Sequence, residues 1–352
     1  MSRFLSSRFA SQKPYTPGEQ PKDRRYIKLN TNESPYPPSP KAVENAAKAA
    51  EELQLYSDPE CKKLTAALSA LYGIGEDEVI WTNGSDDVLY FAFSAFCDEK
   101  TPAIFPDITY GFYPVFARYC GVPYQTVPLR DDFSVDPARY YDSGKTVFIA
   151  NPNAPTGLVL TVPEIEEILC RNPNNVVVID EAYVDFGGES SVPLIRRYEN
   201  LLVTQTFSKS RSMAGARLGF GVASPALISD LKQVKYSINP YAINSMTMAA
   251  GIGALSDEAY TRANCEKIRA TRAYCAEKLR KMGFCLTDSR ANFLFVRHPR
   301  VSGEALYCKL RERGILVRHF SQPRIEDYCR VTVGSREEMD AFLIGVAKIL
   351  EE

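Results

Sequence analysis

The chain has 352 residues, of which 45% are hydrophobic and 24% are charged, values typical of a globular protein that buries a core without disulfides. Lysine and arginine total 42 and aspartate and glutamate total 43, so the net charge of -1 gives no reason to expect nucleic acid as a partner. No apolar run is long enough to span a bilayer, and no membrane partner is expected.

The first predicted feature is an extended arm over residues 1–40. This segment is rich in proline, serine and charged residues, and its run PYPPSP at residues 35–40 cannot lie inside a helix. The alanine-rich residues 41–55 follow and are typical of a helix.

Short β-branched runs then alternate with helical patterns, for example at residues 86–96 and 162–171. Apolar strands that alternate with helices indicate an α/β fold with a mostly parallel seven-stranded sheet flanked by helices. Such sheets place their sites at the carboxyl ends of the strands. The predicted strands are residues 79–82, 102–105, 124–128, 146–150, 176–179, 201–204 and 218–222.

The pattern changes after about residue 228 to that of a smaller α+β domain. We expect a large domain at residues 41–240 and a small domain at residues 241–352. Within the second, helices are predicted at 244–282 with a break near 256, at 302–313 and from 337, and strands at 292–297, 315–318 and 328–333.

The cysteines and histidines limit the possible chemistry. Nine cysteines are scattered without a CxxC pair, which favours reduced thiols and a cytoplasmic location. The N-terminal residues have no continuous apolar segment of the kind found in a secretory signal. Only His298 and His319 are present, so a site with several histidine ligands is nearly excluded and no metal is expected. The chemistry must come from other residues or from a cofactor.

Several polar residues follow predicted strands at the points where these strands end. Asp180 comes directly after an apolar strand, Lys209 lies just past the next one, and Arg217 precedes another apolar run. An earlier strand–turn–helix segment offers backbone N–H groups and a positive helix end to a phosphate. That turn consists of Gly84, Ser85 and Asp86.

Each of these signals alone has a simpler explanation. An aspartate after a strand is more often a helix cap, a lysine in a loop is usually solvated, and a Gly-Ser-Asp segment is usually only a turn. Together, a phosphate cradle, a carboxylate and a lysine at adjacent strand ends are what pyridoxal phosphate requires. The lysine amine forms a Schiff base, and the carboxylate keeps the pyridine nitrogen protonated.

Four motifs, in this order, resemble the histidinol-phosphate aminotransferase family of fold-type I pyridoxal-phosphate enzymes. They are LNTNESPYPP, NPNAPTG, DEAYVDF and SKSRSMAGARLGF, and the resemblance extends from KPYTPGEQ to VTVGSREE. The resemblance implies the fold-type I architecture, pyridoxal 5'-phosphate as cofactor, a small amino donor and an oxo acid as partners, and a homodimer. It also implies that the arm contributes to the small domain and to the dimer contact.

The resemblance implies three catalytic residues. Lys209 would form the Schiff base and carry the proton, Asp180 would pair with the pyridine nitrogen, and Tyr183 would hydrogen-bond the phenolic oxygen. Tyr110 resembles the residue that stacks on the ring, and Tyr56 resembles the tyrosine that reaches the phosphate of the neighbouring subunit. The other implied cofactor contacts are Gly84, Ser85, Asp86, Asn153, Thr206, Ser208 and Arg217.

One motif departs from the family pattern. The usual NPNNPTG is NPNAPTG here, with Ala154 where an asparagine often contacts the phenolic oxygen. Either Asn153 takes that contact from the adjacent position, or Tyr183 holds the oxygen alone.

The resemblance also implies the substrate contacts. Arg330 matches the arginine that binds the α-carboxylate of amino acids, and Arg318 matches a second arginine that helps to hold the substrate phosphate. A surface charge at a strand edge explains Arg318 equally well. Tyr15 is another implied contact, and its alternative explanation is a packing residue of a domain-exchanged arm. The remaining implied contacts are Asn32, Glu33 and Asn292.

The implied reaction is amino transfer from L-histidinol phosphate to 2-oxoglutarate, giving imidazole acetol phosphate and L-glutamate, a step of histidine biosynthesis. An aromatic or broad-specificity aminotransferase, or a threonine-phosphate decarboxylase, would share these motifs. A non-catalytic protein on the same scaffold would have no need to retain Lys209, Asp180, Tyr183 and Arg217.

Overall fold

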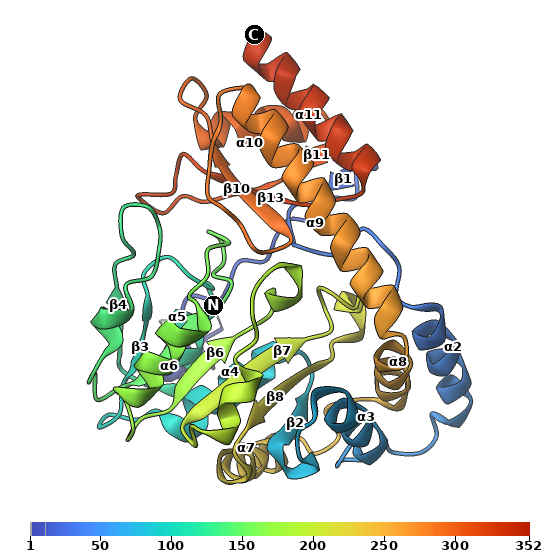
Figure 1. Cartoon of the computed structure of the whole chain (residues 1–352), viewed down its shortest axis with the longest axis vertical. Helices are drawn as coiled ribbons and strands as arrows, with labels where there is room; N and C mark the ends of the chain where they lie inside the picture. Colours follow the sequence, from blue (N-terminus) through green and yellow to red (C-terminus); the bar gives the residue numbers. More distant parts are fainter. Residues whose placement is uncertain (1, 11) are drawn as a thin grey trace.

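A seven-stranded sheet forms the centre of the larger part of the protein (Figure 1). The computed structural model describes residues 2–10 and 12–352. The strands lie in the order β2-β8-β7-β6-β5-β3-β4; β8 runs antiparallel to both neighbours and the other pairs are parallel, which confirms the predicted sheet. Their bounds are Val79–Thr82 (β2), Ala103–Pro106 (β3), Tyr124–Val127 (β4), Thr146–Ala150 (β5), Val177–Asp180 (β6), Leu201–Thr206 (β7) and Gly219–Ala223 (β8).

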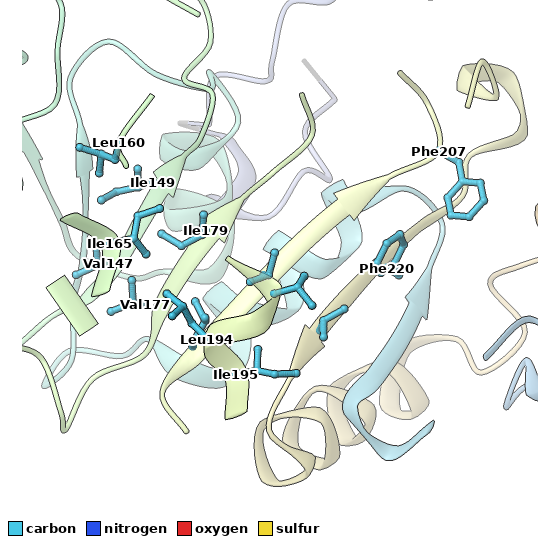
Figure 2. Close-up of a cluster of buried hydrophobic side chains, with 14 of the residues drawn as sticks. Val147, Ile149, Leu160, Ile165, Val177, Ile179, Leu194, Ile195, Phe207 and Phe220 are labelled. Carbon is cyan, nitrogen blue, oxygen red and sulfur yellow. The ribbon is translucent and has the colours of Figure 1, made fainter. Parts of the chain in front are cut away.

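Helices cover both faces of this sheet, as its apolar strands require. Helices α3, α6 and α8 pack on one face, with α2 against α8, and helices α4, α5 and α7 pack on the other. Figure 2 shows the first of these cores, where Val147, Ile149, Val177 and Ile179 of the strands gather with Ile165 of α6. The bounds are Pro40–Ala49 (α2), Lys62–Tyr72 (α3), Ser85–Phe96 (α4), Tyr113–Cys120 (α5), Val162–Cys170 (α6), Pro225–Ile238 (α7) and Ser245–Leu255 (α8).

The alternation of side chains along β6 decides which residues reach the site. Successive residues of a strand point to opposite faces. Val177 and Ile179 lie in the core with α6, whereas Val178 lies in the core with α4 and α5. Asp180 therefore lies on the α4 and α5 side, and Glu181 on the opposite side.

The C-terminal part is built on a four-stranded antiparallel sheet in the order β12-β13-β10-β9. Helices α9, α10 and α11 pack with it around a separate apolar core, and α9 reaches from this part to α8 (Figure 1). The bounds are Glu258–Lys281 (α9), Cys285–Leu286 (β9), Phe293–Arg297 (β10), Gly303–Glu312 (α10), Ile315–Leu316 (β11), Arg318–His319 (β12), Cys329–Thr332 (β13) and Arg336–Glu351 (α11).

The N-terminal arm joins the two parts of the molecule. A short strand of the arm, β1 (Ile27–Lys28), pairs in parallel with β11. Nearer the N-terminus, the side chain of Gln12 donates to the carbonyl oxygen of Arg118 at the end of α5. The remaining short elements are α1 (Ser7–Ala10) and the 3-10 helices Ala50–Glu52, Glu76–Glu78, Pro137–Tyr140, Val184–Phe186, Val192–Arg196 and Ala214–Ala216.

Some predicted boundaries need correction. The helix predicted at residues 41–55 ends as an α-helix at Ala49, and the strand predicted at 315–318 is two short strands with different partners. The division into domains at residue 240 remains a prediction, and the packing of α8 on α2 and α3 favours a boundary within α9.

The described residues contain neither a candidate membrane helix nor a candidate metal site. No helix within residues 2–10 and 12–352 is long and apolar enough to cross a membrane. In the same residues, no group of three or more histidine, cysteine, aspartate or glutamate side chains is placed to hold a metal ion.

Candidate active site

A cavity lies at the carboxyl ends of β5, β6 and β7, the edge at which parallel sheets place their sites. The last residues of these strands, Ala150, Asp180 and Thr206, all line it. The other lining residues are Ser85, Asp86, Tyr110, Ala154, Ala182, Tyr183, Ser208, Lys209 and Arg217. Of the predicted cofactor residues, only Gly84, Asn153 and Tyr56 are absent from this lining.

One end of the cavity is suited to a phosphate. Gly84 precedes α4 with a φ of +84°, and a Cβ there would lie 2.4 Å from a terminal nitrogen of Arg217. The Arg217 guanidinium bonds Oδ2 of Asp86 at 3.2 Å and Oγ of Ser208 at 3.4 Å. The first turn of α4 adds backbone N–H groups that no side chain caps. Free amides, a guanidinium and hydroxyl groups together make a cradle for a dianion.

Asp180 is the buried carboxylate of the cavity, with 5% of its surface exposed. Burial raises the pKa of this carboxyl to about 6, and nearby Asp86 acts in the same direction. Bonds from the backbone N–H of Ala182 and from the hydroxyl of Tyr113 oppose that rise. The carboxylate is therefore ionised at neutral pH and would favour a positive ring nitrogen beside it.

Lys209 provides the amine of the cavity. Its Nζ donates to the carbonyl oxygen of Thr31 at 3.2 Å and lies 5.8 Å from the centre of the Tyr183 ring. Burial lowers the pKa of this amine to about 8, and Arg330 lowers it further while Glu33 acts against them. A larger neutral fraction makes the amine a better nucleophile at neutral pH.

Two tyrosines complete the cavity wall. The hydroxyl of Tyr183 accepts a bond from the side-chain amide of Asn32 at 2.9 Å, which leaves its own proton free for donation into the cavity. The hydroxyl of Tyr110 donates to Oδ1 of Asp86 at 2.7 Å. That bond ties the Tyr110 ring to the phosphate end of the site.

The structure does not bring Asn153 to the cavity. Its amide nitrogen donates to the carbonyl oxygen of Ile108 and to the hydroxyl of Thr156, and its oxygen accepts from Thr109. The Asn153 side chain is therefore bonded to the loop before Tyr110 and to Thr156 of its own loop, while Ala154 lines the cavity.

Tyr56 also lies away from the cavity of its own chain. Its side chain is 85% exposed and stacks on Tyr241 at 4.7 Å. A contact with the phosphate of a neighbouring subunit remains a prediction.

The predicted substrate residues gather beside Lys209. Arg330 on β13 donates to the carbonyl oxygen of Asn30 at 3.1 Å, and its buried Nε has no partner in the described part of the chain. Asn292 donates to the carbonyl oxygen of Asn32 at 3.0 Å, and its Oδ1 is likewise without a described partner. Buried polar atoms without partners are rare in folded proteins, and atoms of this kind beside a cavity are candidates to bond a ligand.

Arg318 and the arm lie next to this group. Arg318 on β12 is the direct cross-strand partner of Arg330, and its two terminal nitrogens donate to the carbonyl oxygens of Thr16 and Pro17, each at 3.2 Å. Tyr15 stacks on Phe112, with ring centres 4.2 Å apart. Of the predicted substrate residues, Glu33 instead forms an ion pair with Lys28 at 2.7 Å.

Tyr113 is a site residue that the sequence analysis missed. It is fully buried at the start of α5, and its hydroxyl lies 3.1 Å from Oδ2 of Asp180. The available signal was a second tyrosine three residues after Tyr110 in the segment TYGFY.

The residues of the cavity fit pyridoxal phosphate. The cradle around Gly84 suits the phosphate, Asp180 suits the ring nitrogen, Tyr183 suits the phenolic oxygen, and Lys209 suits the aldehyde carbon. A Cβ at Gly84 would displace the Arg217 guanidinium from the cradle, and the φ of +84° is a conformation that glycine adopts without strain.

Comparisons with known proteins agree with this geometry. Residues 24–345 match the family model described as aminotransferase class I and II. The chain is 46% identical to a histidinol-phosphate aminotransferase of Brachyspira hyodysenteriae, with all of both chains covered, and 48% identical to histidinol-phosphate aminotransferase 1 of Bordetella parapertussis, with 99% of each covered. The structure also resembles the histidinol-phosphate aminotransferase of Sinorhizobium meliloti, solved in complex with pyridoxal-5'-phosphate, with a TM-score of 0.85 at 23% identity over 93% of this chain and 92% of that one.

Proposed function

The chain belongs to the aminotransferase class I and II family, and from this membership we propose that it is a pyridoxal-phosphate-dependent histidinol-phosphate aminotransferase. It transfers the amino group of L-histidinol phosphate to 2-oxoglutarate in histidine biosynthesis, giving imidazole acetol phosphate and L-glutamate. The observation that carries the substrate assignment is the pair of arginines beside the cavity, Arg318 and Arg330.

These arginines favour a dianionic substrate. Arg318 and Arg330 lie directly opposite each other on neighbouring strands, an arrangement in which like charges repel. A phosphate placed at the unpaired Nε of Arg330 relieves that repulsion and takes a charge-assisted bond. L-Histidinol phosphate has no carboxylate, so its phosphate is the anion that would bind at Arg330. When glutamate occupies the same site, its α-carboxylate would take the place of the phosphate.

The cofactor supplies one part of the chemistry. When bound, pyridoxal phosphate provides a protonated ring that accepts the electron pair left behind when the substrate carbon loses its proton. Arg217, Ser208 and the first turn of α4 would bind its phosphate, and Tyr183 would donate to its phenolic oxygen. Asp180 would hold the proton at its ring nitrogen.

Lys209 supplies the other part. Its amine would hold the cofactor covalently, and its Nζ would accept and return the proton of the substrate carbon. A pKa of about 8 suits this work, because the amine both accepts and releases a proton near neutral pH.

The pH dependence of cofactor attachment tests this role of Lys209. We expect the rate of combination of cofactor-free protein with pyridoxal phosphate to rise with a midpoint near pH 8, because only the neutral amine reacts and burial sets its pKa at about 8. An ordinary lysine would give a midpoint near 10.4. Stopped-flow absorbance between pH 6.5 and 10 measures the rate.

The variant Glu33→Gln is a matched test of the same pKa. The Glu33 carboxylate raises the pKa of Lys209, so its removal is expected to move the midpoint downward. An unchanged midpoint in this variant, or a midpoint near 10 in the wild type, contradicts the assigned environment.

Half-reactions test the substrate assignment. The cofactor-loaded protein is mixed separately with L-histidinol phosphate, glutamate, phenylalanine and threonine phosphate, without any oxo acid, and the cofactor absorbance is followed. L-Histidinol phosphate and glutamate are expected to convert the cofactor to its amino form. Phenylalanine is expected to react at least about tenfold less efficiently, since it brings one negative charge to the arginines where the phosphate brings two.

Each alternative function has its own outcome in this experiment. Faster conversion by phenylalanine than by L-histidinol phosphate indicates an aromatic or broad-specificity aminotransferase. Release of CO2 from threonine phosphate indicates a decarboxylase. An unchanged absorbance with all four compounds contradicts transamination altogether.

We also propose that the protein acts in the cytoplasm as a homodimer. Exposed apolar side chains of Leu53, Leu55, Tyr56 and Tyr241 support a surface covered by a second copy. Sedimentation equilibrium tests the dimer against the chain mass of 39.3 kDa, and a value equal to that mass refutes it.

A further inference from the structure

Asp180 accepts one hydrogen bond from the protein at each carboxylate oxygen. Oδ1 accepts from the backbone N–H of Ala182 at 3.2 Å, a bond that any residue at position 182 except proline would supply. Oδ2 accepts from the hydroxyl of Tyr113 at 3.1 Å, from 67 residues earlier in the chain. Only this second bond depends on the identity of a side chain.

The surroundings of Tyr113 fix the direction of its hydroxyl. The residue is 0% exposed, and its ring packs at 5.7 Å from Phe105, 5.8 Å from Tyr110 and 5.9 Å from Phe148, measured between ring centres. A ring held on several sides keeps one rotamer, so its hydroxyl has one available acceptor direction. That direction leads to Asp180.

The hydroxyl of Tyr113 is always a donor here. Burial, followed by the charge of Asp180, raises the pKa of this phenol well above its ordinary value. The phenol therefore keeps its proton wherever the enzyme is folded, and a donated bond stabilises the ionised form of its acceptor.

We propose that Tyr113 is a positioning residue for the reaction, whose hydroxyl keeps the Asp180 carboxylate ionised and turned toward the ring nitrogen of pyridoxal phosphate. The proposal rests on the proposed function, because it assigns the partner of Asp180 to that cofactor. Tyr113 itself does not line the cavity, so it acts through Asp180.

The charges around Asp180 bring its pKa close enough to neutral pH for the bond from Tyr113 to influence its protonation state. Burial and Asp86 of α4 raise the pKa of the Asp180 carboxyl to about 6, while Lys209, the Ala182 amide and Tyr113 lower it. The Tyr183 phenol also faces this group. Because this carboxyl titrates about one unit below neutral pH, removing a donor that lowers its pKa increases the protonated fraction at neutral pH.

The test is the pH dependence of cofactor binding in the variant Tyr113→Phe. Dissociation constants for pyridoxal phosphate are measured between pH 5 and 9 on the full-length protein. Affinity is expected to fall on acidification as Asp180 takes up a proton, and the midpoint of that fall is expected about one to two pH units higher in the variant. At pH 7 this corresponds to an affinity loss of about 2- to 10-fold.

Tyr140→Phe is the matched control. Tyr140 is also 0% exposed, and its hydroxyl has no hydrogen-bond partner in residues 2–10 and 12–352. Removing this hydroxyl is expected to leave the midpoint unchanged. A shift equal to that of Tyr113→Phe would show that the loss of any buried phenol is responsible, and would overturn the proposal.

A double-mutant cycle tests the route through Asp180. In the Asp180→Asn background no carboxyl remains to titrate, so adding Tyr113→Phe is expected to change the pH dependence no further. The same shift in that background overturns the proposal, because Tyr113 would then act by another path.

A second variant keeps the test decisive if Tyr113→Phe fails to fold. Replacing Tyr113 by 3-fluorotyrosine preserves the ring and makes the phenol a stronger donor, so the midpoint is expected to move downward. An unchanged midpoint with this residue overturns the proposal. None of these measurements uses a substrate, so failure of L-histidinol phosphate to react would refute the substrate assignment without bearing on Tyr113.

Discussion

Replacing Lys209 by alanine is expected to lower the rate of transamination by roughly 10⁴-fold or more. The amine is both the attachment point for the cofactor and the group that moves the proton, and no other lysine or histidine lines the cavity among the described residues. The rate is measured as glutamate formed from 2-oxoglutarate with L-histidinol phosphate as donor. Cofactor binding is measured separately, because the phosphate cradle around Gly84 remains intact.

Lys235→Met is the matched control for this prediction. Lys235 is a second buried lysine, with 4% exposure, and its amine donates to the carbonyl oxygen of Pro59, outside the cavity. Its replacement removes a buried amine but is expected to leave the rate within a few-fold of the wild type. Full activity in Lys209→Ala would refute the mechanism.

Replacing Asp180 by asparagine is expected to lower the rate by roughly 30- to 5,000-fold. The amide has the shape of the carboxylate but no charge, so it cannot hold the proton on a ring nitrogen. Breaking a buried charge pair costs about 2–5 kcal/mol, which is the source of this range. The kcat is measured under saturating cofactor, so that a loss of cofactor affinity is not mistaken for a loss of chemistry.

The neighbouring carboxylate provides the control. Glu181 is as buried as Asp180 but lies on the opposite face of the sheet, where it accepts bonds from Ser190, Ser191 and Gln205. Glu181→Gln is expected to lower the free energy of unfolding by about 1–3 kcal/mol and to change kcat by less than about threefold. An equal loss of kcat in both variants would mean that burial of any carboxylate at this strand end is what matters.

The sheet and the centre of the site could be predicted because they follow from local rules. The strand that ends at Asp180 and the strand that precedes Lys209 each begin with three apolar residues, and every residue of both strands is buried, as expected of strands covered on both faces. Neighbouring parallel strands end at the same edge of the sheet. The side chains of Asp180 and Lys209 are therefore expected close together, independently of the conformation of the loops.

The parts that could not be predicted depend on side-chain direction and on long-range packing. The family motif places the asparagine that contacts the phenolic oxygen at position 154, one residue after Asn153. The side chain of Asn153 instead bonds the loop at Thr109, and Ala154 lines the cavity. Tyr113 reaches Asp180 only because α5 packs on that face of the sheet. Sequence spacing does not reveal such a contact between a helix and a distant strand end.

The contacts of Arg318 with the arm have a consequence for how this segment evolves. Both terminal nitrogens bind backbone carbonyl oxygens, of Thr16 and Pro17, and a carbonyl is present whatever residue occupies the position. Substitutions there preserve the two acceptors, whereas inserting or deleting one residue between Gln12 and Glu19 moves every acceptor by a full residue along the chain. Orthologous sequences should therefore vary in composition at positions 16 and 17 while keeping the length of this stretch without gaps.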